Sequence, residues 1–369
     1  MSCYNPKFGY LEVCGIKEDG SPKQKMVFVN REYKNRANEA NKTAPAFFFA
    51  DGSLIEPFSI PCGMCAGCRN DHAREWAARC VCESMLYPAE TCHFLTLTYN
   101  DEHLPHGTKD IASTDIDEVR HFVDLLRKKF RDRYNHTGMR YFAATEYGDK
   151  HSRPHAHLLL FNAPFPDGDF ERIGNNFRGD VYFVSSMIDE IWRDEFGESK
   201  GFHTIAELNI DTAAYTARYA MKKLKGHSSQ FYVNAGIEPE AQSCSLRPGI
   251  GAAYALANQG KIYTLDEFIN YDYNKGKYYL QNVRDKLILP NGIEQKPPRY
   301  FDKLYARQSD ATAYNMALIK QVREQNGELA LLGKLARCNY TEEQLLHIEA
   351  REQNNAFKKL VRGFEKGIL

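Results

Sequence analysis

The sequence lacks an apolar run that approaches the roughly 18 residues of a membrane-spanning helix, so we expect no membrane partner. It also lacks a basic start followed by an apolar block, and we therefore expect no secretory signal peptide. Net charge is absent, because 48 Lys and Arg residues balance 48 Asp and Glu residues. Any contact with a polyanion must then come from local patches. What is present, 43% hydrophobic and 26% charged residues over 369 positions, is the composition of a globular protein.

The ten cysteines are clustered, and six of them fall between residues 62 and 92. A secreted disulfide framework would be shorter and would spread its bridges, so the clustering indicates a reducing compartment such as a cytoplasm. Cys62, Cys65 and Cys68 form a C-x-x-C-x-x-C run, which predicts a structural Zn²⁺ site with an unidentified fourth ligand. An iron–sulfur cluster, or reduced and partly buried thiols at the start of a helix, are the alternatives.

Hydrophobic periodicity predicts a mixture of strands and helices, which indicates the α+β class. Asp211 is expected to cap a helix that ends at Gly226. From residue 310 onward the pattern is helical, and Thr341 with Gln344 forms a capping box for the last helix. The other central elements are a strand at 92–99, a helix at 117–134, and strands within 139–148 and 153–164.

Two histidines and an upstream glutamate predict a metal site. Side chains alternate along a strand, so His155 and His157 point to one face. If the turn between the two strands centres on residues 148–153, Glu146 lies opposite His155 and all three side chains converge. Two imidazoles and a carboxylate bind a divalent cation and leave positions for substrate oxygens. The alternative is a pair of ordinary surface or core histidines.

The predicted helix at 212–225 carries two tyrosines and a group of lysines. Tyr215 and Tyr219 are four residues apart and therefore share a face, and Lys222 and Lys223 follow one turn later. A phenol is a poor nucleophile at its ordinary pKa of about 10. A nearby cation and a metal-polarised phosphate would both lower the barrier to its attack. The alternative is that the tyrosines pack in the core and the lysines favour the helix C-terminus.

The order of these motifs resembles that of the HUH endonucleases that initiate rolling-circle replication. The carrying segments are FLTLTY, then RPHAHLLLF, then YTARYAMKK with its Tyr-x-x-x-Tyr and lysines. Together with PCGMCAGCRNDHAREWAARC and LRPGIG, they are similar to the replication initiators of gokushovirus-type microviruses, which are small single-stranded DNA phages. The resemblance covers about residues 60–260, with one departure, the small Ala156 between the histidines where a bulky residue is usual.

The resemblance implies an HUH-type fold, which is a central antiparallel sheet flanked by helices, with the histidines on a central strand. It divides the chain into an N-terminal strand and loop arm at 1–60 and an endonuclease domain at 61–260, with the cysteine-rich segment at 62–92. Residues 261–369 form a mostly helical extension. This extension has no Walker motif, so we expect no helicase.

Carried over residue by residue, the resemblance makes Glu146, His155 and His157 the ligands of Mg²⁺ or Mn²⁺. Tyr219 matches the family's tyrosine that is followed by a lysine, and Tyr215 matches the second tyrosine of two-tyrosine members.

The implied activity is transesterification of single-stranded DNA or of double-stranded origin DNA in the host cytoplasm. Tyr219 attacks the scissile phosphate, which leaves a 5′-phosphotyrosine and a free 3′-OH that primes a host polymerase. Lys222 or Lys223 balances the charge on the phenolate or the phosphate. Tyr215 attacks in the next round and frees the displaced strand for rejoining.

Basic patches make up for the neutral total charge. Residues 120–133 hold six Lys and Arg against two Asp, a pattern most typical of a solvated helix face. Residues 218–227 hold four Lys and Arg and no acid. We expect DNA contacts from Arg218 and Lys225 in that patch, and from Arg153 beside the ligand strand.

Two other functions are compatible with the motifs. A zinc-stabilised, non-catalytic nucleic-acid-binding protein would keep the cysteines and basic patches and be indifferent to loss of Tyr215, Tyr219 or the histidines. An HUH transposase would share the chemistry and recognise different DNA.

Overall fold

The computed structural model describes residues 3, 6–16, 18, 22–29, 58–148, 151–175, 179–218, 229–265, 269–272, 277–280, 283–341, 344–352 and 354–355. By its contacts the chain divides into two units. The first comprises Met1–Arg69 with Tyr340–Ala356, and the second comprises Asn70–Asn339 with Phe357–Leu369. Whether residues 61–260 act as a separate endonuclease domain stays a prediction.

The first unit contains a three-stranded antiparallel sheet in the order β2-β1-β3. Its strands are β1 (Lys7–Ile16), β2 (Pro22–Val29) and β3 (Phe58–Ile60). The predicted capping box is confirmed, because the Thr341 amide donates to Gln344 Oε1 at 2.9 Å and the Gln344 amide donates to Thr341 Oγ1 at 3.2 Å. A helix follows from residue 344.

The second unit is built on a seven-stranded sheet in the order β10-β5-β6-β4-β9-β8-β7, and each neighbouring pair is antiparallel. The strands are β4 (His93–Thr98), β5 (Arg140–Tyr147), β6 (Pro154–Phe161), β7 (Phe170–Asn175), β8 (Val181–Ser185), β9 (His203–Glu207) and β10 (Gln242–Cys244). The α+β class and the central antiparallel sheet are therefore confirmed.

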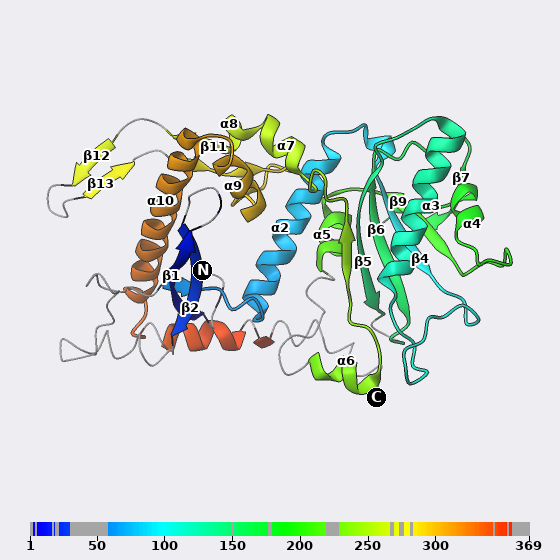
Figure 1. The fold of residues 1–369 in the computed structure, drawn as a ribbon, viewed down its shortest axis with the longest axis horizontal. Coiled ribbons are helices and arrows are strands. Elements are labelled where there is room, and N and C mark those ends of the chain that lie inside the picture. The colour runs from blue at the N-terminus through cyan, green and yellow to red at the C-terminus, as the bar shows by residue number, and fades with distance from the viewer. Residues whose placement is uncertain are drawn as a thin grey trace. The chain divides into compact units, whose positions relative to one another are not determined.

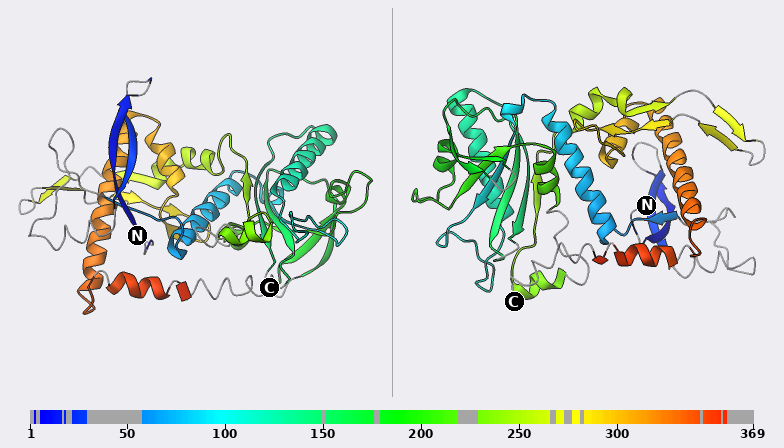
Figure 2. Two further views of the ribbon diagram at one scale, coloured as in Figure 1. Left: turned by 60° about the horizontal axis from the view of Figure 1, so that its bottom comes forward. Right: turned by 180° about the vertical axis from the view of Figure 1, so that it is seen from behind.

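Helices cover both faces of this sheet (Figures 1 and 2). On one face, α3 (Ile116–Tyr134) and α4 (Ser186–Ile191) bury apolar side chains against alternate residues of β4 and β6. On the other face lie α2 (Ala66–Ser84), whose first turn belongs to the first unit, and α5 (Ile210–Arg218). Every second side chain of the inner strands therefore faces each helical layer, as the pleat requires.

The helix boundaries follow from their caps. The predicted helix at 117–134 is confirmed as α3, which begins where the Asp115 side chain accepts hydrogen bonds from two backbone amides. The predicted cap of α5 at Asp211 is wrong. Asn209 caps this helix, because its Oδ1 accepts from the Thr212 amide at 2.9 Å and its own amide donates to Thr212 Oγ1 at 2.8 Å. The predicted helix end at Gly226 lies outside the described residues.

The rest of the second unit consists of short hairpins and helices, and the helical C-terminal region is confirmed. Its helices are η1 (Ala89–Thr91), α6 (Gln230–Ala235), α7 (Ala252–Ala257), α8 (Gln259–Ile262), α9 (Arg299–Ala306) and α10 (Asp310–Leu335). Its strand pairs are β11 (Tyr263–Leu265) with β14 (Val283–Asp285), β12 (Ile269–Asp272) with β13 (Lys277–Leu280), and β15 (Leu287–Ile288) with β16 (Glu294–Gln295). In the described part of the chain, no helix combines the length and apolarity that crossing a membrane requires.

A buried carboxylate ties α2 to the sheet. Glu83 is 1% exposed, and its Oε1 accepts from the Arg140 guanidinium of β5 at 2.5 Å. Its Oε2 accepts from the Gly251 amide at 2.6 Å, just before α7. One side chain thus joins a helix, a strand and the beginning of the C-terminal region.

We expect Glu83→Ala to lower the free energy of unfolding by about 3 kcal/mol, because it leaves the Arg140 guanidinium without its buried counter-charge. Urea unfolding followed by tryptophan fluorescence measures this change. Glu90→Ala, at an exposed position of η1, is the matched control and should stay within about 0.5 kcal/mol of wild type. Equal stabilities for both variants would contradict this role of Glu83.

His93 makes the stability of the second unit depend on pH. Burial lowers the pKa of His93 to about 4, although its Nε2 donates to the Ala163 carbonyl at 3.0 Å. The folded state therefore holds this ring neutral, whereas the unfolded chain protonates it below about pH 6.5. Stability is retained above that pH and falls as the pH drops from 6.5 toward 4.

From pH 7 to pH 5, His93 should cost about 2 kcal/mol of unfolding free energy. His93→Gln keeps a donor for the carbonyl and does not titrate, so its urea midpoints should fall less over the same range. Identical pH dependence in both proteins would rule out this contribution.

Candidate active site

Strand register brings the predicted triad together. In the β5–β6 pair, Glu146 lies opposite His155 and Ala144 lies opposite His157. The connecting turn closes with a hydrogen bond from the Gly148 amide to the Arg153 carbonyl at 3.0 Å. The register expected from a turn at 148–153 is confirmed, and it places Glu146, His155 and His157 on one face of the sheet.

The three side chains form a compact cluster. Glu146 Oε1 lies 2.6 Å from His155 Nε2 and 3.1 Å from His157 Nε2. Glu146 and His157 are buried, at 2% and 4% exposure, whereas the His155 side chain is 19% exposed. Burial alone would raise the pKa of the Glu146 carboxyl, but hydrogen bonds from the two histidines and their charge together hold that pKa well below its usual range. The carboxylate is therefore ionised, and the cluster meets solvent at His155.

Contacts on the far side of each ring fix its orientation. His155 Nδ1 lies 3.1 Å from the Arg153 carbonyl, which can only accept, so Nδ1 carries a proton. His155 Nε2 then faces a carboxylate, and a second proton or a bound cation must lie between them. His157 Nδ1 bonds the Thr96 hydroxyl at 3.0 Å, which likewise turns its Nε2 toward Glu146.

This donor set fits a divalent cation. One carboxylate oxygen and two imidazole nitrogens, all within 4.8 Å of one another, are the atoms that such ions bind. Outer contacts that fix ring orientation, like those of Thr96 and the Arg153 carbonyl, are typical of metal-binding histidines.

A tyrosine lies directly beside the cluster. The Tyr215 ring of α5 is 5.2 Å from the His157 ring and 6.1 Å from Phe94, which itself stacks on His157 at 5.5 Å. Tyr215 remains 42% exposed, while its neighbours Thr216 and Ala217 are buried and hold α5 against the sheet. An accessible phenol thus borders the metal ligands.

The remaining predicted site residues are placed less completely. Tyr219, Lys222, Lys223 and Lys225 lie outside the described residues. Arg218 is exposed as the last residue of α5. Its predicted contact with DNA stays a prediction.

Arg153 has partners within the protein. Its guanidinium donates to the Tyr99 carbonyl at 2.8 Å and to Asp101 Oδ1 at 2.6 Å, which holds the loop after β4. Its predicted contact with DNA also stays a prediction. In the other basic patch, Lys129 and Arg133 both pair with Glu190, as expected of a helix face with local partners.

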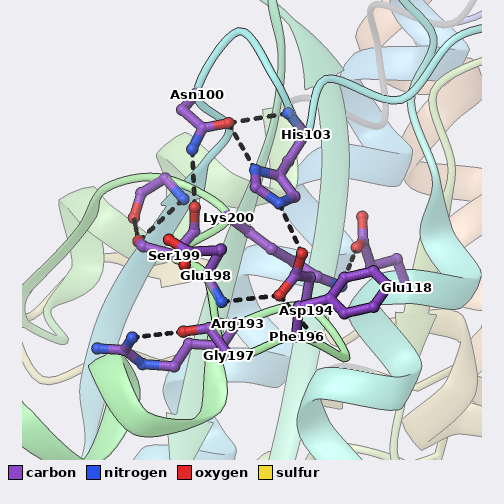
Figure 3. A network of polar contacts seen from close by, with 11 residues as sticks. Asn100, His103, Glu118, Arg193, Asp194, Phe196, Gly197, Glu198, Ser199 and Lys200 are labelled. Atoms are coloured by element: carbon purple, nitrogen blue, oxygen red, sulfur yellow. Dashed lines mark hydrogen bonds and ion pairs between the residues drawn. The ribbon is translucent and has the colours of Figure 1, made fainter.

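The loop after β4 is also anchored on its other side (Figure 3). Asn100 Oδ1 accepts from the amide of His103 at 2.8 Å, and His103 Nε2 lies 3.1 Å from Asp194 Oδ2. Asp194 in turn accepts from the Glu198 amide at 2.7 Å. These contacts agree with the interpretation of His103 as a loop residue rather than a metal ligand.

Sequence reasoning missed Thr96 as part of the site. Alternation along β4 puts Thr96 on the face of Phe94, but its position opposite His157 depends on the β4–β6 pairing, which no short turn dictates.

The fold and the site define an antiparallel α+β protein with a metal-binding triad beside a tyrosine-bearing helix. A family model described as replication-associated protein ORF2 matches residues 92–224. The chain is 32% identical over 310 residues to replication-associated protein ORF2 of Spiroplasma virus 4, covering 84% of this chain and 87% of that protein. It is 29% identical over 257 residues to replication-associated protein VP4 of Bdellovibrio phage phiMH2K, covering 69% of each.

A third relative, replication-associated protein ORF4 of Chlamydia phage 1, is 28% identical over 272 residues, covering 72% of this chain and 59% of that protein. The chain belongs to this family of replication-associated proteins of small phages, which confirms the resemblance found in its motifs. No solved structure matches it.

We expect Thr96→Val to weaken Mn²⁺ binding about 10-fold, because the isosteric side chain cannot hold the His157 ring. Titration calorimetry with Mn²⁺ measures the affinity. Thr96→Ser keeps the hydroxyl and should bind the ion within about twofold of wild type. If Thr96→Val binds Mn²⁺ as wild type does, the hydroxyl does not orient the ligand.

Proposed function

We propose that this chain starts phage DNA replication by nicking DNA through a tyrosine transesterification and later rejoins the displaced strand. The observation that carries the proposal is the contact between the Tyr215 ring and the His157 ring, 5.2 Å apart, beside Glu146 and His155. A nucleophile of this kind next to a three-ligand cation site suits attack on a phosphodiester. The family membership supports the role in replication.

In this proposal, Glu146, His155 and His157 hold Mg²⁺ or Mn²⁺, and the bound ion supplies charge stabilisation at a phosphate oxygen. The chain's own residues position the reactants. The packing of α5 places a phenol beside the ligands, and Phe94 and Thr96 keep His157 in place. The partly exposed edge at His155 leaves an approach for the DNA backbone.

The covalent step exchanges one phosphoester for another. The phenol loses its proton to solvent, its oxygen bonds to phosphorus, and the bond between phosphorus and the 3′ oxygen breaks. The 3′ oxygen takes up a proton and leaves as a free hydroxyl that a host polymerase can extend, while the 5′ phosphate stays on tyrosine. Tyr219 makes the first attack and Tyr215 the second, and Lys222 or Lys223 balances the charge.

Covalent capture tests this function. The full chain is incubated with Mn²⁺ and single-stranded fragments that tile the phage genome, and protein–DNA adducts are sought on denaturing gels. We expect an adduct with one fragment, lost on chelation by EDTA and reduced at least about 100-fold in His157→Ala. Tyr219→Phe should abolish first-strand capture, and Tyr215→Phe should block rejoining.

Tyr314→Phe, at an exposed position of α10, is the matched control and should form the adduct normally. Binding to the fragments without any adduct would favour the non-catalytic alternative. An adduct that persists after both Tyr215 and Tyr219 are changed to Phe would refute the assigned nucleophiles. Capture confined to transposon ends would favour the transposase alternative.

A further inference from the structure

The geometry points to a zinc site made of four cysteines, in which Cys3 supplies the fourth ligand beside Cys62, Cys65 and Cys68. The four Sγ atoms lie within 4.8 Å of one another. Cys3 precedes Cys62 by 59 positions, so the ion would join the beginning of the chain to the start of α2. All four residues belong to the first unit, and the site is therefore independent of the proposed nicking chemistry.

The sulfur separations are those of tetrahedral coordination. Zn–S bonds of about 2.3 Å at tetrahedral angles place two sulfurs about 3.8 Å apart. Cys65 Sγ lies 3.8 Å from Cys3 Sγ, and Cys62 Sγ lies 4.0 Å from Cys68 Sγ. Each cysteine takes part in one of these two distances, and both are about twice the length of a disulfide bond. The arrangement therefore suits four sulfurs around one ion.

The backbone is arranged to support thiolates. The Cys62 amide donates to Cys3 Sγ at 3.3 Å, and the Cys65 amide donates to Cys62 Sγ at 3.3 Å. The Cys68 amide donates to Cys65 Sγ at 3.5 Å. Gly63 has a φ of +72°, a conformation that favours glycine and lets the chain turn tightly between Cys62 and Cys65. Amide donors stabilise negative charge on sulfur, which is the form that binds metal.

Ligand chemistry identifies the ion. A closed set of four thiolates selects zinc or iron among biological metals. One ion held by four separate cysteines, with no position for substrate, is typical of a structural zinc site. Such an ion would also close the long connection between Cys3 and Cys62, which contains the β1–β2 hairpin. A three-stranded sheet has little core of its own, and small units of this kind commonly depend on a metal.

Metal analysis of the full chain, purified without chelators, tests the site. To exclude ions at the triad, the measurements use His157→Ala as the parent protein. We expect about one zinc per chain by mass spectrometry of the elements. Adding Cys3→Ser should lower zinc affinity about 100-fold in competition with a chromophoric chelator, and should weaken the tetrahedral absorption bands of the Co²⁺-loaded protein.

Cys14→Ser is the matched control, because Cys14 is an exposed cysteine of β1 whose Sγ donates to the Lys23 carbonyl. It should keep zinc and the Co²⁺ spectrum of the parent. Zinc bound at parental affinity in Cys3→Ser would overturn the role of Cys3, and iron in stoichiometric amounts would overturn the choice of zinc.

Alkylation of the unsubstituted chain gives a test that does not depend on how a variant folds. With zinc bound, iodoacetamide should modify Cys14 and leave Cys3, Cys62, Cys65 and Cys68 protected. After zinc is removed by a chelator, these four should become reactive together. If Cys3 reacts as fast as Cys14 while zinc is bound, Cys3 is not a ligand.

Discussion

The candidate active site depends on the register of β5 and β6. Because side chains alternate along a strand, a slip of one residue would move Glu146 to the face covered by α3 and separate it from His155 and His157. Apolar packing on both faces prevents this slip. Ala143 and Leu158 are buried in the cluster against α3, while Phe142 and Leu159 are buried in the cluster on the face of α2 and α5. Core packing therefore sets the positions of the polar side chains.

The sequence was sufficient where a contact depends on local geometry. Glu146, His155 and His157 could be brought together because a short turn joins their strands, and the observed pairing agrees. Thr96 depends on a pairing between strands some 60 residues apart, and Cys3 depends on a contact across 59 positions, so neither followed from spacing. The antiparallel α+β fold followed from the periodicity and the resemblance together.

Local capping chemistry was ambiguous in the same way. Asn209 and Asp211 both carry a side chain that caps helices well, and the sequence alone favoured the one next to the alanine-rich segment. The reciprocal bonds between Asn209 and Thr212 decide the boundary in favour of the earlier residue.

Two buried carboxylates of this protein show how a partner's chemistry separates a structural charge from a functional one. Glu83 is matched by the Arg140 guanidinium, which does not give up its proton, so this pair is permanent. Glu146 is matched by two imidazoles, whose protons can be exchanged for a cation without moving the ligand atoms. The same burial therefore stabilises the fold at Glu83 and prepares a site at Glu146.

Ligand type also bears on which ion each proposed centre holds. Four thiolates strongly favour zinc over Mg²⁺ or Mn²⁺. The triad is less selective, because two imidazoles bind Zn²⁺ more tightly than Mn²⁺ in the usual order of affinities. Occupancy of the triad by Mg²⁺ or Mn²⁺ therefore has to reflect metal availability and the oxygen ligands that a DNA phosphate adds. A closed sulfur site needs no such help, which suits it to a permanent structural ion, whereas the triad suits an exchangeable one.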